Sequence, residues 1–192
     1  MPNDETRSRE ELLAEIARLE NELKTQQQSF LDDRRQLAAT FDSAPTMYLL
    51  LSSERKVERA NKAMAEFLGL ELDSLIGRGF GELLGCANYV PQGPICGGST
   101  KCQLCDIRTT VEQTIQSRVG VNQLDVPFKR FIDGQLVERR LLLSTVPIVI
   151  KDDNHVLVSI EDLTTVRKIE EEVEKSRRMQ SIGTLAGGIA HD

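Results

Sequence analysis

The N-terminal part of the chain has a helical spacing of apolar positions. From Glu10 to about Leu37 it contains no glycine or proline. Gln26 and Asp33 interrupt a series of apolar residues that are otherwise separated by alternating steps of four and three: Leu12, Ile16, Leu19, Leu23, Phe30 and Leu37. This spacing predicts an amphipathic helix that pairs with a copy of itself as a coiled coil. The alternative is a solvated helix that folds back on its own domain.

After this helix the period of the pattern changes. Met47–Leu51 is a short apolar run that predicts a strand, and the polar residues 52–56 predict a turn before a second short strand around Val57. A helix is expected from Asn61 to Leu68, closed by the glycine that follows it. This region should therefore form a hairpin that runs into a helix.

Helices and irregular backbone alternate in the middle of the chain. The segment ELDSLIGRGFGELLG predicts another short helix punctuated by glycine, and the cysteine-containing stretch that follows it is rich in glycine and proline. Ile107, Val111 and Ile115 recur every four residues, which predicts a helix that begins just after Cys105.

Three strands and a final helix are predicted for the last third. Residues 121–163 contain an Asp133-Gly134 turn between two apolar-rich runs, and a polar KDDN turn before a third run. This arrangement predicts three successive antiparallel strands. From Thr164 to about Arg178 a charged helix is expected, with one apolar side: Val166, Ile169 and Val173.

Composition limits the classes of function. The 192 residues are 40% hydrophobic and 28% charged, which allows one globular core with helical extensions. The net charge is -6 and the basic residues are interleaved with acidic ones, so nucleic acid is not expected as a partner. The N-terminus lacks the apolar core of a signal peptide, and the longest apolar run, Leu141 to Ile150, is too short to span a bilayer. We therefore expect a cytoplasmic protein without membrane insertion.

The order of the predicted elements resembles that of a PAS domain. The segment ERKVERANKAMAEFLGL is similar to the second strand and following helix of that family. The segment SIEDLTTVRKIEEEVEKSRR is similar to its last strand and to the Asp-Leu-Thr junction that opens an output helix. The resemblance covers roughly residues 36–175. It implies an α+β fold with a five-stranded antiparallel sheet, short flanking helices, and coiled-coil-like helices at both termini.

This resemblance also suggests how the chain is divided. Residues 1–38 form the N-terminal coiled-coil segment, 39–163 the PAS sensor domain with a cysteine-rich insertion at 86–105, and 164–192 the signalling helix and the start of a phosphoacceptor helix. Asp162 and Thr164 then lie where the sheet passes a signal to the output helix. Both residues are also N-cap candidates on physical grounds alone.

The C-terminal stretch, SRRMQSIGTLAGGIAHD, closely resembles the phosphoacceptor segment of dimerising histidine kinases. The resemblance implies that His191 is the phosphorylated residue and that Asp192 assists proton transfer. The chain ends one residue after His191, and these residues contain no phosphate-binding glycine loop. We therefore expect a sensory front end that does not phosphorylate itself alone; a response regulator would be the partner of the whole kinase.

All four cysteines lie between Cys86 and Cys105, with Cys96 and Cys102 between them and the spacing C-x9-C-x5-C-x2-C. In a reducing cytoplasm such a group is more typical of metal ligands or redox groups than of disulfides. Four thiolates suit tetrahedral zinc or an iron–sulfur cluster. Two other interpretations stay open, a dithiol switch at the C-x2-C pair and cysteines that merely pack.

Among these interpretations we expect an iron–sulfur cluster, because a sensor gains from a centre that responds to its environment and structural zinc does not respond. Haem is disfavoured because His155, in the KDDNH stretch, is expected at the surface, and no flavin-type Asn-Cys-Arg-Phe motif is present. The predicted function is the homodimeric input module of a sensor histidine kinase that responds to redox state or a diatomic gas. The alternative is a PAS interaction module with structural zinc and an unidentified small ligand.

Overall fold

The computed structural model describes residues 9–90, 96 and 98–191, and for residues 181–191 it describes the backbone alone. The chain divides after Ser43 into two units. The first is the helix α1 (Arg9–Ser43), which extends past the boundary expected at residue 38. None of the side chains described in α1 is buried within this chain, and its series of apolar residues is exposed. The helix prediction is confirmed, whereas its pairing with a second copy stays a prediction.

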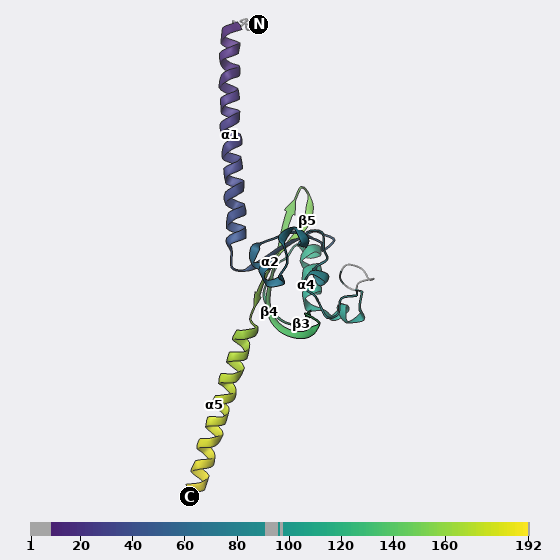
Figure 1. Ribbon diagram of the computed structural model, residues 1–192, viewed down its shortest axis with the longest axis vertical. Helices are drawn as coiled ribbons and strands as arrows, with labels where there is room; N and C mark the ends of the chain where they lie inside the picture. The colour runs from purple at the N-terminus through teal and green to yellow at the C-terminus, as the bar shows by residue number, and fades with distance from the viewer. Residues whose placement is uncertain (1–8, 91–95, 97, 192) are drawn as a thin grey trace. The chain divides into compact units, whose positions relative to one another are not determined.

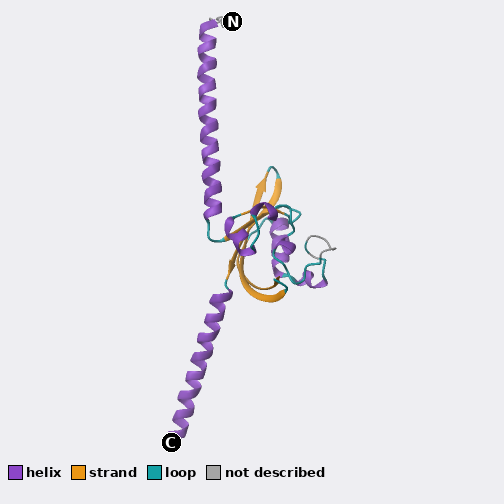
Figure 2. Cartoon of the chain, viewed as in Figure 1, coloured by secondary structure: helices purple, strands orange, loops and turns teal. Residues whose placement is uncertain are grey.

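The second unit is built on one five-stranded sheet. The strands are β1 (Met47–Leu51), β2 (Val57–Ala60), β3 (Val121–Ile132), β4 (Gln135–Ile150) and β5 (Asp153–Asp162). Their order is β2-β1-β5-β4-β3, and all neighbours are antiparallel (Figure 2). The central pairing of β1 with β5 joins the first strand of the unit to the last. The predicted α+β fold with a five-stranded antiparallel sheet is confirmed.

Short helices connect the two halves of the sheet, and α4 packs on β4 and β5 (Figure 1). The helical elements of the second unit are α2 (Lys62–Leu68), η1 (Leu72–Leu75), α3 (Phe80–Leu83), η2 (Thr100–Leu104), α4 (Asp106–Ser117) and α5 (Thr164–His191). No helix in the described part of the chain combines the length and apolar character that crossing a membrane requires.

The core lies on one face of the sheet because every second strand residue points into it. Leu49 and Leu51 of β1, Leu141 and Leu143 of β4, and Ile160 of β5 have no exposed surface. The alternation is the period-two pattern of a sheet with one buried face. From the opposite side, α4 contributes the buried residues Ile107 and Val111.

Asn61 connects the start of α2 to β1. Its side-chain Oδ1 accepts hydrogen bonds from the N–H of Met64 (3.2 Å) and of Tyr48 (2.9 Å), and its Nδ2 donates to the carbonyls of Thr46 (2.8 Å) and Ala44 (3.2 Å). The residue is fully buried. The predicted helix start is therefore an N-cap that also fixes the first strand.

The two hairpin turns of the last three strands are where the sequence predicts them. Asp133 and Gly134 both have positive φ, as do Lys151 and Asp152. Two consecutive residues with positive φ match the right-handed twist of the flanking strands.

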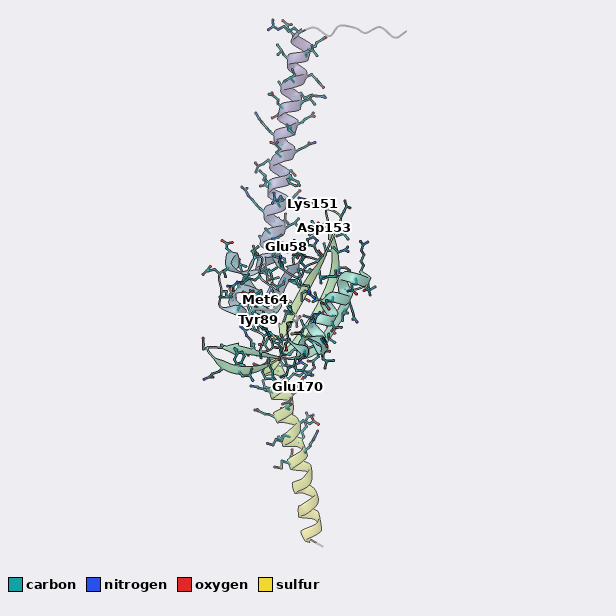
Figure 3. All side chains as sticks on the ribbon, turned by 90° about the vertical axis from the view of Figure 1, so that its right-hand side faces the viewer. Glu58, Met64, Tyr89, Lys151, Asp153 and Glu170 are labelled. Atoms are coloured by element: carbon teal, nitrogen blue, oxygen red, sulfur yellow. The ribbon has the colours of Figure 1, made fainter. Side chains whose placement is uncertain are left out.

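His155 differs from the expectation that it lies on the surface. It belongs to β5 and is 7% exposed. Its Nε2 lies 2.9 Å from the Glu58 carboxylate of β2, and its Nδ1 lies 3.0 Å from the Asp153 carbonyl. Figure 3 shows Glu58 close to Asp153. The turn ends earlier than the polar composition suggests, so the histidine becomes a strand residue that joins β5 to β2.

Candidate functional site

The first cysteine is fixed by short backbone pairing with the edge strand β3. Cys86 follows α3, and its N–H donates to the Gly81 carbonyl (3.0 Å). On either side, the N–H of Ala87 donates to the Lys129 carbonyl, and the N–H of Phe131 donates to the Gly85 carbonyl, each at 2.9 Å. Gly85 has φ 62°, and a Cβ there would lie 3.2 Å from the Phe131 carbonyl oxygen, so the close approach requires glycine.

Cys102 and Cys105 lie at the opposite end of the segment, in and after η2. The Cys102 N–H donates to the Ser99 carbonyl (3.0 Å), and Cys105 is the residue before α4 begins. The Cys102 thiol is buried and lies 3.8 Å from the Asn88 carbonyl, two residues after Cys86. Arg108 of α4 donates to the Cys102 carbonyl at 3.4 Å. The two ends of the cysteine segment therefore meet.

Cys96 is the cysteine between these two ends, and it is half-buried. Its Sγ lies 3.2 Å from the position that a Cβ on Gly81 would occupy. The glycine in α3 therefore leaves room for the Cys96 thiol. All four cysteines lie among the described residues, and all are free thiols.

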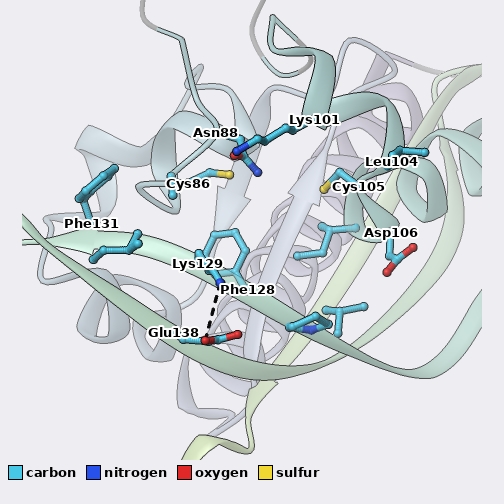
Figure 4. Close-up of a pocket in the computed structure, with 15 residues that line it drawn as sticks. Cys86, Asn88, Lys101, Leu104, Cys105, Asp106, Phe128, Lys129, Phe131 and Glu138 are labelled. Carbon is cyan, nitrogen blue, oxygen red and sulfur yellow. Dashed lines mark ion pairs between the residues drawn. The ribbon is translucent and has the colours of Figure 1, made fainter.

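A pocket of about 690 Å³ opens between the cysteine segment and β3. Figure 4 shows Cys86 and Cys105 on opposite sides of it, with Phe128 and Lys129 of β3 between them. Lys129 Nζ lies 3.9 Å from the Glu138 carboxylate at one edge. Both thiols are thus within reach of a molecule that enters the pocket.

The thiols are close enough to affect one another's ionisation. Burial raises the pKa of the Cys86 thiol; a backbone hydrogen bond at Asn88 offsets part of this rise, and the thiols of Cys105 and Cys102 add smaller contributions to it. Burial likewise raises the pKa of Cys96, with added contributions from Cys105 and Cys102, whereas the Arg55 guanidinium lowers it. Burial and the neighbouring thiols therefore favour the neutral form of Cys86 and Cys96 in the metal-free protein.

Ion pairs surround this segment on its α4 side. Glu112 of α4 accepts from Arg108 Nε at 2.9 Å and also pairs with Arg55. These contacts connect the turn between β1 and β2 to α4, the helix that follows Cys105.

The four thiols are suitable metal ligands by type, but they are not arranged around a common metal position. Within the described residues, no three His, Cys, Asp or Glu side chains are already grouped as metal ligands. Four free thiols, three half-buried and one buried, match the number and type of donors in a tetrathiolate site. Binding would require the segment to close.

The junction between β5 and α5 contains the two residues predicted to relay a signal. Asp162 accepts the N–H of Thr164 at 2.9 Å and also its hydroxyl. The Thr164 hydroxyl oxygen in turn accepts the N–H of Arg140 at 2.9 Å, and Arg139 pairs with the second Asp162 oxygen at 3.4 Å. The side chain of Asp162 caps α5 as its residue type predicts; its role as a relay stays a prediction.

Asp125 is a residue at this junction that the sequence analysis did not single out. Its carboxylate accepts hydrogen bonds from Arg140 Nε at 2.5 Å and from Arg167 of α5 at 2.7 Å, which connects β3 to α5. Partial desolvation would raise the pKa of Asp125, but the hydrogen bonds from both arginines outweigh it and lower that pKa. No local sequence signal predicts this contact, because Asp125 and Arg167 are 42 positions apart.

The proposed phosphoacceptor lies at the end of the described helix. His191 is the last residue of α5. The side chain of His191 and the whole of Asp192 lie outside the described residues.

Comparison with known proteins gives a family match over part of the chain. Residues 35–98 match the family model described as PAS domain, and no curated protein matches. The PAS domain of an HTR-like protein from Haloarcula marismortui is 15% identical, with 72% of this chain and 98% of that one covered and a TM-score of 0.49.

Two further solved structures are similar at the same level. The PAS domain of nitrogen regulation protein NR(II) from Vibrio parahaemolyticus is 16% identical, with 65% and 95% coverage and a TM-score of 0.47. A PAS domain from a two-component sensor histidine kinase is 8% identical, with 68% and 96% coverage and a TM-score of 0.46. The family match at residues 35–98 and the five-stranded antiparallel sheet with its flanking helices give the second unit a PAS-like fold.

Proposed function

We propose that this chain is the input module of a sensor histidine kinase, and that its four cysteines bind an iron–sulfur cluster that responds to redox state or to a diatomic gas. One observation carries the proposal. Four free thiols, two of them in one C-x2-C turn, lie close enough together that Cys102 and Cys105 influence the ionisation of both Cys86 and Cys96.

The ligands in this proposal are Cys86, Cys96, Cys102 and Cys105. When bound, the cluster would supply a centre whose oxidation state or integrity depends on the surroundings. Side chains of this protein would position the cysteine segment for the cluster. Arg108 holds the Cys102 carbonyl, and the positive charge of Arg55 favours the thiolate form of Cys96.

Two routes connect the cysteine segment to the output helix. In one, the pairing of Ala87 with Lys129 couples the segment to β3, whose Asp125 holds Arg167 of α5. In the other, a shift of β5 would reach α5 through Asp162 and Thr164. A signal passes only if the occupied and empty states differ in interaction free energy with these contacts.

Further parts of the proposal follow from the sequence resemblance. The protein would be a cytoplasmic homodimer joined through α1 and α5, whose exposed apolar residues include Leu19 and Ile169. The dimer would present His191 for phosphorylation by the catalytic domain of the full kinase and pass the phosphoryl group to a response regulator.

Structural zinc in a PAS interaction module is the second candidate, because four thiols suit tetrahedral zinc equally well. The compact C-x2-C turn, in which the Cys105 N–H donates to the Cys102 carbonyl at 3.4 Å, favours a single ion held by that pair. In this case the signal would come from an unidentified small molecule.

Anaerobic purification with a visible spectrum and analysis of iron, zinc and acid-labile sulfide tests the proposal. We expect a brown protein with stoichiometric iron and sulfide, which Cys102→Ser loses. Leu104→Ala, in the same turn but at an 88% exposed residue, is the matched control and should keep the metal. A colourless native protein with one zinc per chain would establish the second candidate, and a metal-free protein would exclude both.

A further inference from the structure

Two of the four cysteines face the pocket of about 690 Å³ beside β3. Cys86 and Cys105 belong to its described lining, and Figure 4 shows their sulfur atoms pointing toward one another across it. Cys96 and Cys102 are not among the described residues of that lining. Cys102 is 6% exposed, so the protein encloses its thiol. A molecule that enters the pocket therefore meets the thiols of Cys86 and Cys105 first.

The inner wall of this pocket is apolar. It is formed by Val126 and Phe128 of β3 and Ile107 of α4, and each of them is at most 6% exposed. These three side chains belong to the main hydrophobic core, so the inner wall is part of the packed scaffold. The volume is within the range of pockets that hold small molecules. An ion that moves from water to such a wall loses hydration that apolar atoms do not replace.

The charged residues of the lining are exposed, and their charges balance. They are two lysines and two acidic residues: Lys101, Asp106, Lys129 and Glu138. The Nζ of Lys129 lies 3.9 Å from the Glu138 carboxylate. Arg108 of α4 is outside the described lining, and its Nε lies 2.9 Å from the Glu112 carboxylate. The described lining therefore carries no net positive charge that would compensate an anion for its lost hydration.

We propose that this pocket admits a small uncharged molecule to the thiols of Cys86 and Cys105 and disfavours anions. The physiological meaning of this selectivity rests on the proposed function, in which the cysteine centre responds to redox state or to a diatomic gas. An uncharged gas fits the pocket better than an anionic oxidant does, because it loses almost no hydration at the apolar wall. Cys86 and Cys105 would be the ligands on the side from which the gas arrives, and Cys102 would be shielded from it.

Alkylation of the whole chain, freed of metal and kept reduced, tests this proposal. Iodoacetamide is neutral and iodoacetate is an anion, and each forms a thioether with a cysteine and releases iodide. Both react with the thiolate, so the ratio of their rates at one cysteine does not depend on how far that thiol is ionised. Peptide mass spectrometry gives this ratio for each cysteine, and the uncharged thiol 2-mercaptoethanol gives the reference ratio in water.

We expect the two thiols of the pocket to prefer the neutral reagent. The ratio of the iodoacetamide rate to the iodoacetate rate at Cys86 and Cys105 should exceed the reference ratio at least about fivefold, because the anion loses hydration at the apolar wall. Cys102 should react more slowly than these two cysteines with both reagents, because its thiol is enclosed.

Two substitutions change the charge of the pocket without altering a thiol. Glu138→Gln leaves Lys129 without its carboxylate, and we expect it to raise the relative rate of iodoacetate about twofold. Lys129→Gln should lower that rate by about the same factor. Both side chains are more than half exposed, so these changes should preserve the fold. Lys175→Gln removes the same charge from an exposed residue of α5 outside the described lining, and should leave the ratio unchanged.

Three results would overturn the proposal. They are a ratio at Cys86 and Cys105 equal to that of 2-mercaptoethanol, equal effects of Lys129→Gln and Lys175→Gln, and a rate at Cys102 as high as at the other two cysteines. The alkylation needs no metal, so it is independent of the test of the cluster. A native chain that is purified without iron would overturn the cluster and leave the selectivity of the pocket unaffected. A brown protein whose metal-free form gives the reference ratio would overturn the pocket alone.

Discussion

The sheet and the cysteine segment of this protein are held in place by different interactions. Leu49, Leu143 and Ile160 are buried on one face of the sheet, and their contacts require nothing from outside the chain. In the described part of the cysteine segment, backbone hydrogen bonds hold Ala87 and Cys102, and burial raises the pKa of the Cys86 thiol. The sheet is thus held by apolar packing, whereas we propose that the thiols of the segment depend on a bound centre.

Removing a core side chain should lower the free energy of unfolding more than any other change, and it should destabilise the sheet and the cysteine segment together. Leu143→Ala leaves a cavity between β4 and the helices, and we expect a loss of about 2–5 kcal/mol in the free energy of unfolding. Urea unfolding followed by circular dichroism measures it. The same change at Leu104, which is 88% exposed, should have almost no effect. Equal effects at the two positions would contradict the assigned core.

Raising the pH should destabilise the cysteine segment. The pKa values of Cys86 and Cys96 are raised above the ordinary 9.0, so the folded state of the metal-free protein favours the neutral thiols. Their contribution to stability is complete below that value and is lost as the pH rises through the folded pKa. The double variant Cys86→Ser, Cys96→Ser should therefore lose less stability between pH 8 and 10 than the native chain. An equal loss would show that these thiols are solvated.

Lowering the pH should affect the junction with α5 by a smaller amount, because the Asp125 ion pairs are partly exposed to solvent. The pKa of Asp125 lies below its ordinary 3.8, so its contribution is present above that value and is lost as the pH falls through the folded pKa. Asp125→Asn should remove this part of the acid dependence, as measured by thermal unfolding between pH 5 and 2. Glu170→Gln, whose partner Arg167 keeps its bond to Asp125, is the control.

Local patterns predicted most of the scaffold. The apolar run at residues 47–51, the Asn61 helix start and the Asp133-Gly134 turn all depend on neighbouring residues, so the sequence displays them. The sequence contains no such local pattern for contacts between distant segments. The bond between Asp125 and Arg167 and the burial of Arg130 depend on strand register and on the start of α5, which a single sequence does not specify.

The sequence predicted which residues form the candidate site but not how they are arranged. Four cysteines in one window indicated a common site, and the structure brings Cys102 near the turn that follows Cys86. The sequence did not indicate that β3 forms one wall of the pocket, because Lys129 and Phe128 lie more than twenty positions beyond Cys105. His155 was misplaced for a related reason, since its burial depends on Glu58 of another strand.

Hydrogen exchange of the anaerobically purified native chain, compared with Cys102→Ser, tests most directly whether a thiolate-bound centre orders the cysteine segment. The account predicts that protection of the amides in residues 86–105 and in the adjoining part of β3 falls in the variant, while β1 and β5 keep theirs. Unchanged protection throughout would contradict the proposed centre, because the segment would then be ordered without its thiols acting together.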